Sequence, residues 1–444
     1  MTIEKRELYP YQHEALVHCM NNENVALFME MRFGKTLVTI RALQYHGNVL
    51  VVAPLSVLGT WQNELAAEGI PNVCTLRGPV EGREAHVREL FRFRTAPCWV
   101  LTNYETLRLA PGITKLPWYA VVFDESSKLR NVRTKTSKIC LSEFKRTKRR
   151  FILTGLPAPE SPLDYWGQMA FLDGEFMKHR SYWTFRDRLF MQPTGRTYGW
   201  FPRKGVKDQI RDAVNERAFV LSRKNAGIGN KRVYETRMVE PSPEQERLFA
   251  EIKGHWEATL GEEKLSTKWA MVAASWVNQV SGGFLHKQKV GDGKLQELVE
   301  LLKGELADQQ VVVWFRFNAE LEATHALLQE RGLKSCMVLG ETKPELRYDY
   351  VNEFNARKVR VLLVQLKCGK FGLNLSSSST AIYFSNGFSH EDRAQSEDRI
   401  EHTEKNEPLL FIDLVTRGSS DQRILNLLNQ KVKQSRYFYN EVLS

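Results

Sequence analysis

The stretch MEMRFGKT (Met29–Thr36) ends in Gly-Lys-Thr, as a phosphate-binding loop does. Compared with the general pattern G-x-x-x-x-G-K-[ST], Met29 replaces the first glycine, and Arg32 stands where a second glycine would be expected. The apolar run VALFM before the loop and LVTIRAL after it predict the order of strand, loop and helix that the motif requires. Backbone N–H groups would then hold phosphate, Lys35 would neutralise the β- and γ-phosphates, and Thr36 would bind Mg²⁺. Taken alone, the stretch fits this site and an ordinary helix start about equally.

Short apolar runs alternate with amphipathic stretches around this loop and again later in the chain. From about Val25 to Leu172 these runs are NVALFM, NVLVVAP, CWVLTNYE, AVVFDE and RRFILTG. From about Gln310 they are QVVVWFRF, KSCMVLG, VRVLLVQ, TAIYFSN and EPLLFIDLV. Each run has the length of a strand, so the alternation predicts βαβ units and mostly parallel sheets, with ligands at the carboxyl ends of the strands. We therefore expect two α/β domains.

The region between these two parts has few strand signals and many Arg, Lys and aromatic residues, as in RSYWTFRDRLF. We interpret it as largely helical. The expected domains are an N-terminal ATP-binding lobe over 1–174, a helical insertion or linking region over 175–293, and a C-terminal lobe over 294–444. The stretches GNKRVYET and VGDGK are candidate linkers, because they combine turn-forming and polar residues.

The composition is that of a folded, soluble chain, with 42% hydrophobic and 26% charged residues. The N-terminus MTIEKRELYPYQHEA lacks the apolar core of a signal peptide, and no run approaches 18 apolar residues, so we expect a cytoplasmic protein without a membrane partner. The net charge of +11 favours a polyanionic partner. The six cysteines form no C-x-x-C pair, which indicates neither a zinc site nor a disulfide framework.

A second chemical element is FDESSK, in which an apolar run ends at Asp124 and Glu125. In a nucleotide hydrolase Asp124 would hold Mg²⁺, and Glu125 would orient or deprotonate the attacking water. A strand that ends in Asp-Glu is common, and the position of this one, a few strand units after Gly-Lys-Thr, favours the functional interpretation.

Further motifs follow in a fixed order. They are LYPYQ (Leu8–Gln12), VVAPLSVLGTWQNE (Val51–Glu64), LTNYETLR (Leu101–Arg108), DESSKLRN (Asp124–Asn131), LTGLPAPESPLDYWGQMAFLD (Leu153–Asp173), SRKN (Ser222–Asn225), VVVWFRF, LVQLKCGKFGLNLS (Leu363–Ser376) and QSEDRIEH (Gln395–His402). From Tyr9 to roughly Leu428 the chain resembles the Swi/Snf-type branch of the superfamily 2 helicase-like ATPases, in a compact form that would suit a bacterial or viral source. The resemblance implies two RecA-like lobes that translocate on double-stranded DNA.

The resemblance also implies roles for individual residues. In this family the phosphate loop reads acidic-Met-Gly-x-Gly-Lys-Thr, so the missing first glycine is normal, and Gln12 would recognise adenine. The implied catalytic residues are Lys35, Asp124, Glu125 and Arg399. The implied nucleotide-binding residues are Gln12, Arg32, Gly34, Lys35, Thr36, Gly372, Arg399 and His402. Mg²⁺ would be held by Thr36 and Asp124, and hydrolysis would be coupled to motion through Thr154, Gly155 and Gln395.

The chain departs from the family at three places. Arg32 replaces the loop glycine, so either the backbone differs or the guanidinium contributes to the phosphate environment. Ser126 and Ser127 replace the more usual Ala-His, which should alter coupling and not metal binding. The last motif normally offers two arginines to the γ-phosphate, and here Arg399 is followed by His402. An arginine finger is worth about 10³ to 10⁵ in rate, so the replacement of the second arginine by His402 predicts a slow enzyme.

Basic stretches with interleaved aromatics predict contact with nucleic acid, because cations contact phosphate and rings can stack on bases. One is Glu143–Arg150, and a second spans 178–237 and contains Arg186 and Arg188. Lys367 and Lys370, in the second-lobe motif, are further candidates. A solvated charged face over an aromatic core is the alternative for any single residue. By default we place four tryptophans in the core: Trp61, Trp166, Trp269 and Trp276.

Together these features predict a DNA-dependent ATPase with ATP and Mg²⁺ as cofactors, which closes its two lobes around ATP and steps along double-stranded DNA. A strand-separating DNA or RNA helicase is the alternative within the enzymes. A second alternative is an ATP-gated DNA-binding module with little turnover. The protein partner and the oligomeric state do not follow from the sequence.

Overall fold

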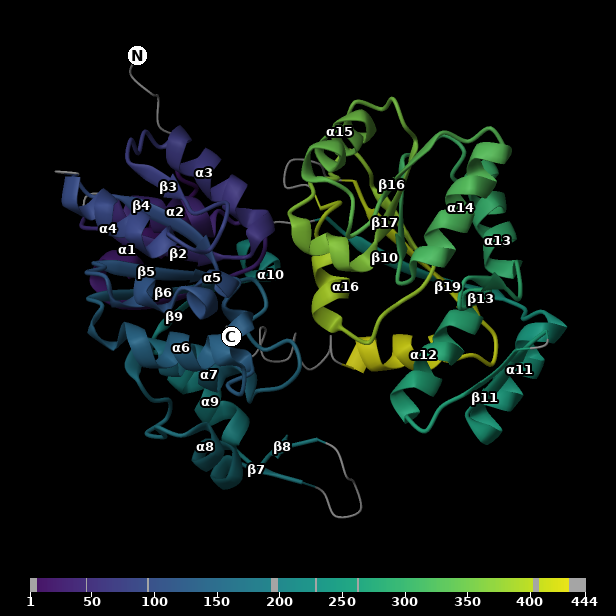
Figure 1. The fold of residues 1–444 in the computed structure, drawn as a ribbon, viewed down its shortest axis with the longest axis horizontal. Coiled ribbons are helices and arrows are strands. Elements are labelled where there is room, and N and C mark those ends of the chain that lie inside the picture. Colours follow the sequence, from purple (N-terminus) through teal and green to yellow (C-terminus); the bar gives the residue numbers. More distant parts are fainter. Residues whose placement is uncertain are drawn as a thin grey trace. The chain divides into compact units, whose positions relative to one another are not determined.

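The computed structural model describes residues 6–44, 46–93, 96–192, 199–227, 230–261, 263–401 and 407–430. The described residues form two compact units (Figure 1). Unit 1 comprises the described residues up to Gly227, and unit 2 comprises those from Asn230 to Gln430. Among the described residues, no helix has the length and apolar character needed to cross a bilayer.

Unit 1 is built on a parallel sheet with the strand order β3-β4-β2-β5-β6-β1-β9. Its strands are β1 (Asn24–Met29), β2 (Val49–Ala53), β3 (Val73–Thr75), β4 (Trp99–Asn103), β5 (Ala120–Asp124), β6 (Arg149–Thr154) and β9 (Ala218–Leu221). Strands such as VLVVA are buried along their whole length, as expected where helices cover both faces of a parallel sheet. The five strands predicted here from apolar runs are confirmed, whereas β3 and β9 were not predicted.

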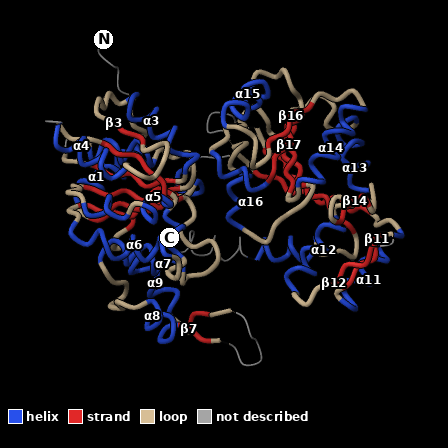
Figure 2. Tube along the Cα trace, viewed as in Figure 1, coloured by secondary structure: helices blue, strands red, loops and turns tan. Residues whose placement is uncertain are grey.

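The helices of unit 1 pack against this sheet (Figure 2). They are α1 (Pro10–Asn21), α2 (Lys35–Leu43), α3 (Leu58–Ala67), α4 (Arg83–Phe93), α5 (Tyr104–Leu109), α6 (Lys135–Glu143), α7 (Asp164–Asp173), α8 (Tyr182–Leu189), α9 (Val206–Asn215) and α10 (Arg223–Ala226), with a 3₁₀ turn η3 (Ser126–Arg130) after β5 and a hairpin of β7 (Phe190–Met191) and β8 (Phe201–Pro202). Helix α5 begins after Asn103, whose side chain accepts a hydrogen bond from the Thr106 amide over 2.9 Å. This cap marks the point where β4 ends and α5 begins.

Unit 2 has a second parallel sheet, with the order β10-β19-β18-β15-β17-β16. Its strands are β10 (Arg232–Val239), β15 (Val311–Phe315), β16 (Ser335–Val338), β17 (Val361–Gln365), β18 (Thr380–Tyr383) and β19 (Leu409–Thr416). The five strands predicted from the second set of apolar runs are confirmed. Two α/β units with parallel sheets and flanking helices are the architecture of two RecA-like lobes.

The remaining elements of unit 2 are helices and short hairpins. They are α11 (Pro243–His255), α12 (Ala270–Ser281), α13 (Gly293–Lys303), α14 (Asn318–Glu330), α15 (Pro344–Asn355), α16 (His390–Glu397), the 3₁₀ turn η5 (Leu366–Phe371), and the strands β11 (Glu257–Leu260), β12 (Glu263–Ser266), β13 (Phe284–Leu285) and β14 (Gln288–Lys289). Residues 421–430 are also helical.

The region 175–293 differs from the largely helical insertion expected from its sequence. It is divided between the units: the part up to Gly227 belongs to unit 1, and the described part after it belongs to unit 2. It supplies an edge strand to each sheet, β9 and β10, because the second half of GNKRVYET continues as β10 and does not act as a linker. The unit boundary lies directly before that stretch.

Three of the four tryptophans expected in the core are buried, and one is not. Trp61, Trp166 and Trp276 are buried, whereas Trp269 is 74% exposed. Trp269 precedes the first residue of α12 as its N-cap, where the chain turns from a hairpin into a helix, so its side chain does not share the buried face of α12. The default core assignment of Trp269 is therefore wrong.

Candidate nucleotide and nucleic-acid site

The predicted phosphate-binding loop lies between β1 and α2 of unit 1, at the carboxyl end of a central strand. Lys35 is the first residue of α2, and its Nζ donates to the carbonyl oxygens of Met29 (2.8 Å) and Glu30 (3.2 Å). The ammonium group therefore folds back over the loop. Backbone amides at the start of α2 and this ammonium group are the two features that a polyphosphate requires.

Gln12 packs directly on this loop. Its Nε2 donates to the Phe33 carbonyl over 3.1 Å, and its Oε1 accepts from the Tyr9 amide over 3.0 Å. Gly34 has a φ of +77°, and a Cβ atom built there would lie 2.3 Å from Gln12 Nε2. Glycine is therefore favoured at position 34 by the left-handed backbone, and a larger residue would also displace the Gln12 amide from the loop.

The backbone at Arg32 is left-handed as well, with a φ of 68°. A residue with a Cβ atom is disfavoured in this conformation by roughly 1–2 kcal/mol, which glycine avoids. The loop therefore has a conformation suited to glycine at position 32, and the Arg32 side chain is exposed. The two explanations for the replaced glycine, a changed backbone and a contribution of the guanidinium to the phosphate environment, stay predictions. Strained residues of this kind gather at binding sites.

The loop is held from the neighbouring strand by Arg223. Strand β9 pairs with β1, with Leu221 opposite Met29, which brings the SRKN motif beside the loop. Arg223 Nη1 contacts Glu30 Oε2 at 2.5 Å, and its Nη2 donates to the Met31 carbonyl over 3.2 Å. Both groups are largely shielded from water, so this ion pair fixes the first half of the loop.

Asp124 ends β5 at the same edge of the sheet and is almost fully buried. Its Oδ2 accepts a hydrogen bond from Trp61 Nε1 over 2.8 Å, and its Oδ1 accepts one from the Glu125 amide over 2.9 Å. Burial raises the pKa of Asp124, while the Trp61 bond, the Lys35 charge and the Glu125 amide act in the opposite direction. Asp124 and the phosphate loop both lie at the carboxyl ends of strands in the same parallel sheet, where the positive charge of Lys35 favours the ionised carboxylate.

Glu125 follows Asp124 with a left-handed backbone, at a φ of 51°. Because of this turn, the side chains of Asp124 and Glu125 leave the backbone in different directions. One carboxylate can therefore face a metal ion while the other faces a water molecule. Tyr104 holds the turn, because its hydroxyl donates to the Asp124 carbonyl over 2.7 Å. Desolvation raises the pKa of the partly buried Tyr104 well above its ordinary value, so its hydroxyl remains a donor at neutral pH.

The residues at this edge fit a magnesium ion. Mg²⁺ prefers oxygen ligands and is usually held by one or two carboxylates, a hydroxyl and the phosphates of a nucleotide. Asp124 supplies a carboxylate whose orientation is fixed by two hydrogen bonds, and Thr36 supplies a hydroxyl from the first turn of α2. The chemistry of this donor set agrees with the predicted metal ligands.

The coupling motif, Leu153–Asp173, contacts the site at two places. Ser126 Oγ donates to Gln168 Oε1 over 2.8 Å, and Gln168 Nε2 donates to the carbonyl oxygens of Pro157 (2.5 Å) and Asp164 (3.0 Å). Both side chains are fully buried. The serine that replaces the family's alanine therefore ties the Asp-Glu turn to α7.

Two of the predicted coupling residues lie at the end of β6: Thr154 is its last residue, and Gly155 directly follows. Thr154 Oγ1 accepts from the Leu156 amide over 3.1 Å. A Cβ atom at Gly155 would lie 3.2 Å from the Met31 amide nitrogen, so a small residue is needed where this motif passes the phosphate loop. The structure thus brings the loop, the carboxylates and the coupling motif together in unit 1.

Unit 2 carries the remaining predicted residues. Arg399 follows α16; its Nε donates to the Gly369 carbonyl over 2.7 Å, and its own carbonyl accepts from the Leu375 amide over 3.0 Å. Gly372 has a φ of 70°, which suits glycine, and Gln395 is buried on α16. The last two second-lobe motifs therefore form one cluster. His402 lies outside the described residues.

The predicted DNA-contacting residues differ in their surroundings. Lys367 and Arg188 are exposed, and the side chain of Lys370 lies outside the described part of the chain. The Arg186 guanidinium stands 4.9 Å from the ring centre of Trp183 and 4.1 Å from that of Trp200, and it contacts Asp187. With 19% of its side chain exposed, Arg186 has a packing role in addition to its charge.

One part of the first basic stretch is structural. Arg149 is buried and donates to the backbone carbonyls of Cys19, Asn22 and Ala42. It closes the amino end of the sheet, so its assignment to a DNA-tracking surface is wrong.

Sequence reasoning missed four contributors: Trp61, Tyr104, Arg223 and Glu30. The motifs that contain them were recognised, but their partners were not, because those partners depend on which strands are neighbours. Arg223 approaches Glu30 only because β9 pairs with β1.

A phosphate loop and a carboxylate pair in one RecA-like unit, with an arginine-bearing helix end in a second, define the class of helicase-like nucleotide hydrolases. The SNF2-related domain matches residues 11–264, and the helicase conserved C-terminal domain matches residues 293–403. Because the first match covers more than half of the chain, the chain belongs to the SNF2-related family of ATPases.

The chain is similar to two curated proteins of Arabidopsis thaliana. It is 26% identical over 97% of its length to a probable ATP-dependent DNA helicase, CHR12, and 25% identical over 93% to the ATP-dependent DNA helicase DDM1. It spans 42% and 59% of the lengths of these relatives. A solved structure, the Sulfolobus solfataricus SWI2/SNF2 ATPase core in complex with dsDNA, is 19% identical with a TM-score of 0.45, covering 99% of this chain and 96% of that one.

Proposed function

We propose that this protein is a DNA-dependent ATPase that translocates on double-stranded DNA and remodels DNA or protein–DNA complexes. The observation that carries the proposal is the grouping of Lys35, Asp124 and Glu125 at one edge of the unit 1 sheet. Family membership and the helicase names of the relatives support it. The net charge of +11 agrees with a polyanionic partner.

Each residue has a proposed role in hydrolysis. Lys35 and the α2 amides hold the phosphates of ATP, and Gln12 contacts the base. Thr36 and Asp124 would hold Mg²⁺, which supplies charge neutralisation at the phosphates. Glu125 orients and deprotonates the attacking water.

Unit 2 supplies the second set of roles. Arg399 contributes positive charge to the γ-phosphate as bonds break, and we propose that His402 contributes less, because imidazole with a pKa near 6.5 is only partly charged at neutral pH. Thr154, Gly155 and Gln395 couple hydrolysis to motion. Gly372 gives its loop the left-handed turn that approach to a nucleotide requires.

The proposed DNA-contacting residues are Arg186, Arg188, Lys367 and Lys370. Basic side chains that neutralise phosphates make binding steeply salt-dependent. The preference for duplex DNA is a proposal that rests on the family. The cytoplasmic location and the compact bacterial or viral source stay predictions of the same kind.

The test is the steady-state rate of ATP hydrolysis without nucleic acid and with single-stranded DNA, duplex DNA or RNA. Duplex DNA should stimulate most. Equal stimulation by RNA contradicts the translocase proposal. Strand separation on a fluorescent tailed duplex would favour the helicase alternative. Tight, ATP-dependent DNA binding without phosphate release would favour the binding module.

Two variants separate binding from catalysis. Lys35→Ala should lose ATP binding or turnover. Glu125→Gln should still bind ATP but hydrolyse it at least about 10²-fold more slowly, because general base catalysis contributes about 10² to 10⁴. A near wild-type rate for Glu125→Gln would remove its assignment as the base.

A further inference from the structure

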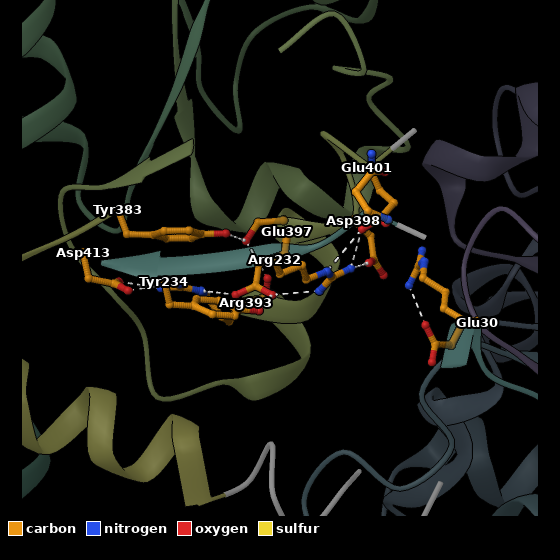
Figure 3. A network of polar contacts seen from close by, with 12 residues as sticks. Glu30, Arg232, Tyr234, Tyr383, Arg393, Glu397, Asp398, Glu401 and Asp413 are labelled. Atoms are coloured by element: carbon orange, nitrogen blue, oxygen red, sulfur yellow. Dashed lines mark hydrogen bonds and ion pairs between the residues drawn. The ribbon is translucent and has the colours of Figure 1, made fainter. Parts of the chain in front are cut away.

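Arg232 is the first residue of β10 and lies at the centre of an ionic cluster in unit 2 (Figure 3). Its Nη1 contacts Glu397 Oε2 at 3.0 Å, and its Nη2 contacts Asp398 Oδ1 at 2.7 Å and Glu401 Oε2 at 2.7 Å. Its side chain is 18% exposed. One guanidinium therefore neutralises carboxylates from three positions of a single short segment.

That segment carries Arg399. Asp398 directly precedes the arginine, and Glu401 follows it by two residues. Arg399 is directed toward the neighbouring motif by the bond from its Nε to the Gly369 carbonyl. Three carboxylates beside one arginine would repel one another and attract its guanidinium if Arg232 did not neutralise them, and the interior setting strengthens both effects.

The far side of the cluster is anchored independently. Arg393 contacts Glu397 Oε1 at 2.7 Å and Asp413 Oδ1 at 2.6 Å, and its guanidinium lies 3.4 Å from the ring centre of Tyr383. Tyr234, on the same strand as Arg232, donates to Glu397 Oε2 over 2.9 Å. Glu397 therefore has Arg393 and Tyr234 as partners in addition to Arg232. The ion pairs described for Asp398 and Glu401 are those with Arg232.

The start of unit 2 is attached to the same segment. The Asn230 amide donates to Glu401 Oε1 over 3.0 Å, and the Asn230 side chain donates to the Glu407 carbonyl over 2.8 Å. Burial acts to lower the pKa of Arg232, but Asp398, Glu397 and Glu401 together raise it well above the ordinary value, so the charge is permanent. The first residues after the unit boundary therefore determine the electrostatic setting of the helix end.

We propose that Arg232 is a positioning residue for Arg399: by neutralising Glu397, Asp398 and Glu401, it prevents these carboxylates from capturing Arg399 and keeps that side chain in the orientation that hydrolysis needs. The proposal rests on the proposed function of Arg399.

The test measures kcat and the KM for ATP, with saturating duplex DNA, for wild type, Arg232→Met, Arg399→Ala and the double variant. Arg232→Met should lower kcat about 10- to 100-fold, since a displacement of about 1 Å costs on the order of 10² in rate. The KM should stay within about twofold, because Lys35 and its loop lie in unit 1. In the Arg399→Ala background the same substitution should change kcat by less than about twofold, because the two residues act as one.

Arg237→Met is the matched control. Arg237 lies on the same strand as Arg232 and pairs with Glu235 and Glu305, outside the α16 segment. It is the last residue of the basic stretch 178–237, but with its guanidinium paired in this way it is not among the proposed DNA-contacting residues. It should keep kcat within about twofold of wild type. Arg232→Lys should lower kcat about 3- to 10-fold, because one ammonium group cannot pair with three carboxylates as the planar guanidinium does. If Arg232→Met unfolds below the assay temperature, Arg232→Lys replaces it in the double variant.

The outcomes distinguish the positioning role of Arg232 from the role of Arg399 in hydrolysis. If wild type and Arg399→Ala hydrolyse ATP equally well, the proposed role of Arg399 fails. If Arg399→Ala has a low kcat but Arg232→Met has the same kcat as the control Arg237→Met, only the positioning role of Arg232 is overturned. An equal loss from Arg232→Met in the wild-type and Arg399→Ala backgrounds also overturns it, because that loss would be structural.

Discussion

The indole of Trp61 donates a 2.8 Å hydrogen bond to the carboxylate of Asp124, from a side chain that is fully buried in the core of unit 1. This bond lowers the pKa of Asp124, whereas burial raises it. We expect Trp61→Phe to raise that pKa further and to weaken Mg²⁺ binding. The acidic limb of the kcat/KM profile should therefore move to higher pH, and the Mg²⁺ concentration at half-maximal rate should rise.

Trp99→Phe is the control for this change. Trp99 is equally buried beside Trp61, with ring centres 6.5 Å apart, so its replacement produces a similar loss of packing. It should destabilise unit 1 without moving the pH profile. Identical profiles for the two variants would contradict the assigned role of Trp61.

Arg32→Gly should relax the phosphate loop. The left-handed backbone at Arg32 disfavours any side chain by roughly 1–2 kcal/mol, so glycine should raise the free energy of unfolding by about 1 kcal/mol. Urea unfolding of the protein measures this difference. Arg32→Ala keeps the Cβ atom and should give no gain, and a lower ATP affinity in both variants would show that the guanidinium itself contacts nucleotide.

Ser126→Ala should weaken the connection between the Asp-Glu turn and α7. The substitution leaves the buried Gln168 Oε1 without its hydroxyl donor, which costs about 1–3 kcal/mol of stability. We also expect a smaller ratio of DNA-stimulated to basal hydrolysis. Ser142→Ala, at an exposed serine of α6, should change neither quantity. An unchanged ratio in Ser126→Ala would limit this serine to a structural role.

Arg188→Glu should reduce DNA affinity more cleanly than any change at Arg186. Arg188 is exposed, whereas Arg186 packs between Trp183 and Trp200, so its loss would also disturb the fold. The slope of log affinity against log salt should fall by about 1, as expected for a lost phosphate contact. Arg211→Glu, at a side chain paired with Asp208 and Asp212, is the control. Equal slopes for the two variants would place Arg188 away from DNA.

Glu320→Gln should change how stability depends on pH. Burial raises the pKa of Glu320 to about 7, against the hydrogen bond from Ser385 and the charge of Lys294. The folded state therefore favours the protonated form: this contribution is fully present below about pH 4.5 and is lost as the pH rises through about 7. The amide cannot ionise, so the stability of the variant relative to wild type should increase from pH 5 to pH 8 by up to roughly 3 kcal/mol. A pH-independent difference in urea unfolding would contradict this.

Ten of the thirteen strands described in the two sheets were predictable, because apolar runs of strand length are typical of buried parallel strands. β3 was missed because VCT is short and only half-buried, and β9 because it lies within a region rich in arginine. The region around 175–293 was misjudged because its two edge strands give weak signals: β9 has only four residues, and β10 mixes charged with apolar residues.

The part of the site that could be predicted is the part that the spacing of motifs along the chain determines. Lys35, Asp124 and Glu125 are each a few residues from a strand end, and parallel strands bring such ends to one edge. The ion pair between Arg223 and Glu30 joins residues far apart in the sequence, and it follows from strand order, which local patterns do not contain. Ser126 shows the same limit, since its partner Gln168 lies on a helix beyond the next strand.

The position of β1 between β6 and β9 has a consequence for synthesis of the chain. Residues 24–29 pair with 150–154 on one side and with 218–221 on the other. At roughly 5–20 residues per second, the ribosome takes on the order of ten seconds or more to deliver the last of these strands. Until then β1 presents an unpaired edge, which is a template for association between chains. Nascent chains of this protein should therefore depend on chaperones most strongly before residue 221 emerges, and fragments that end before β9 should aggregate.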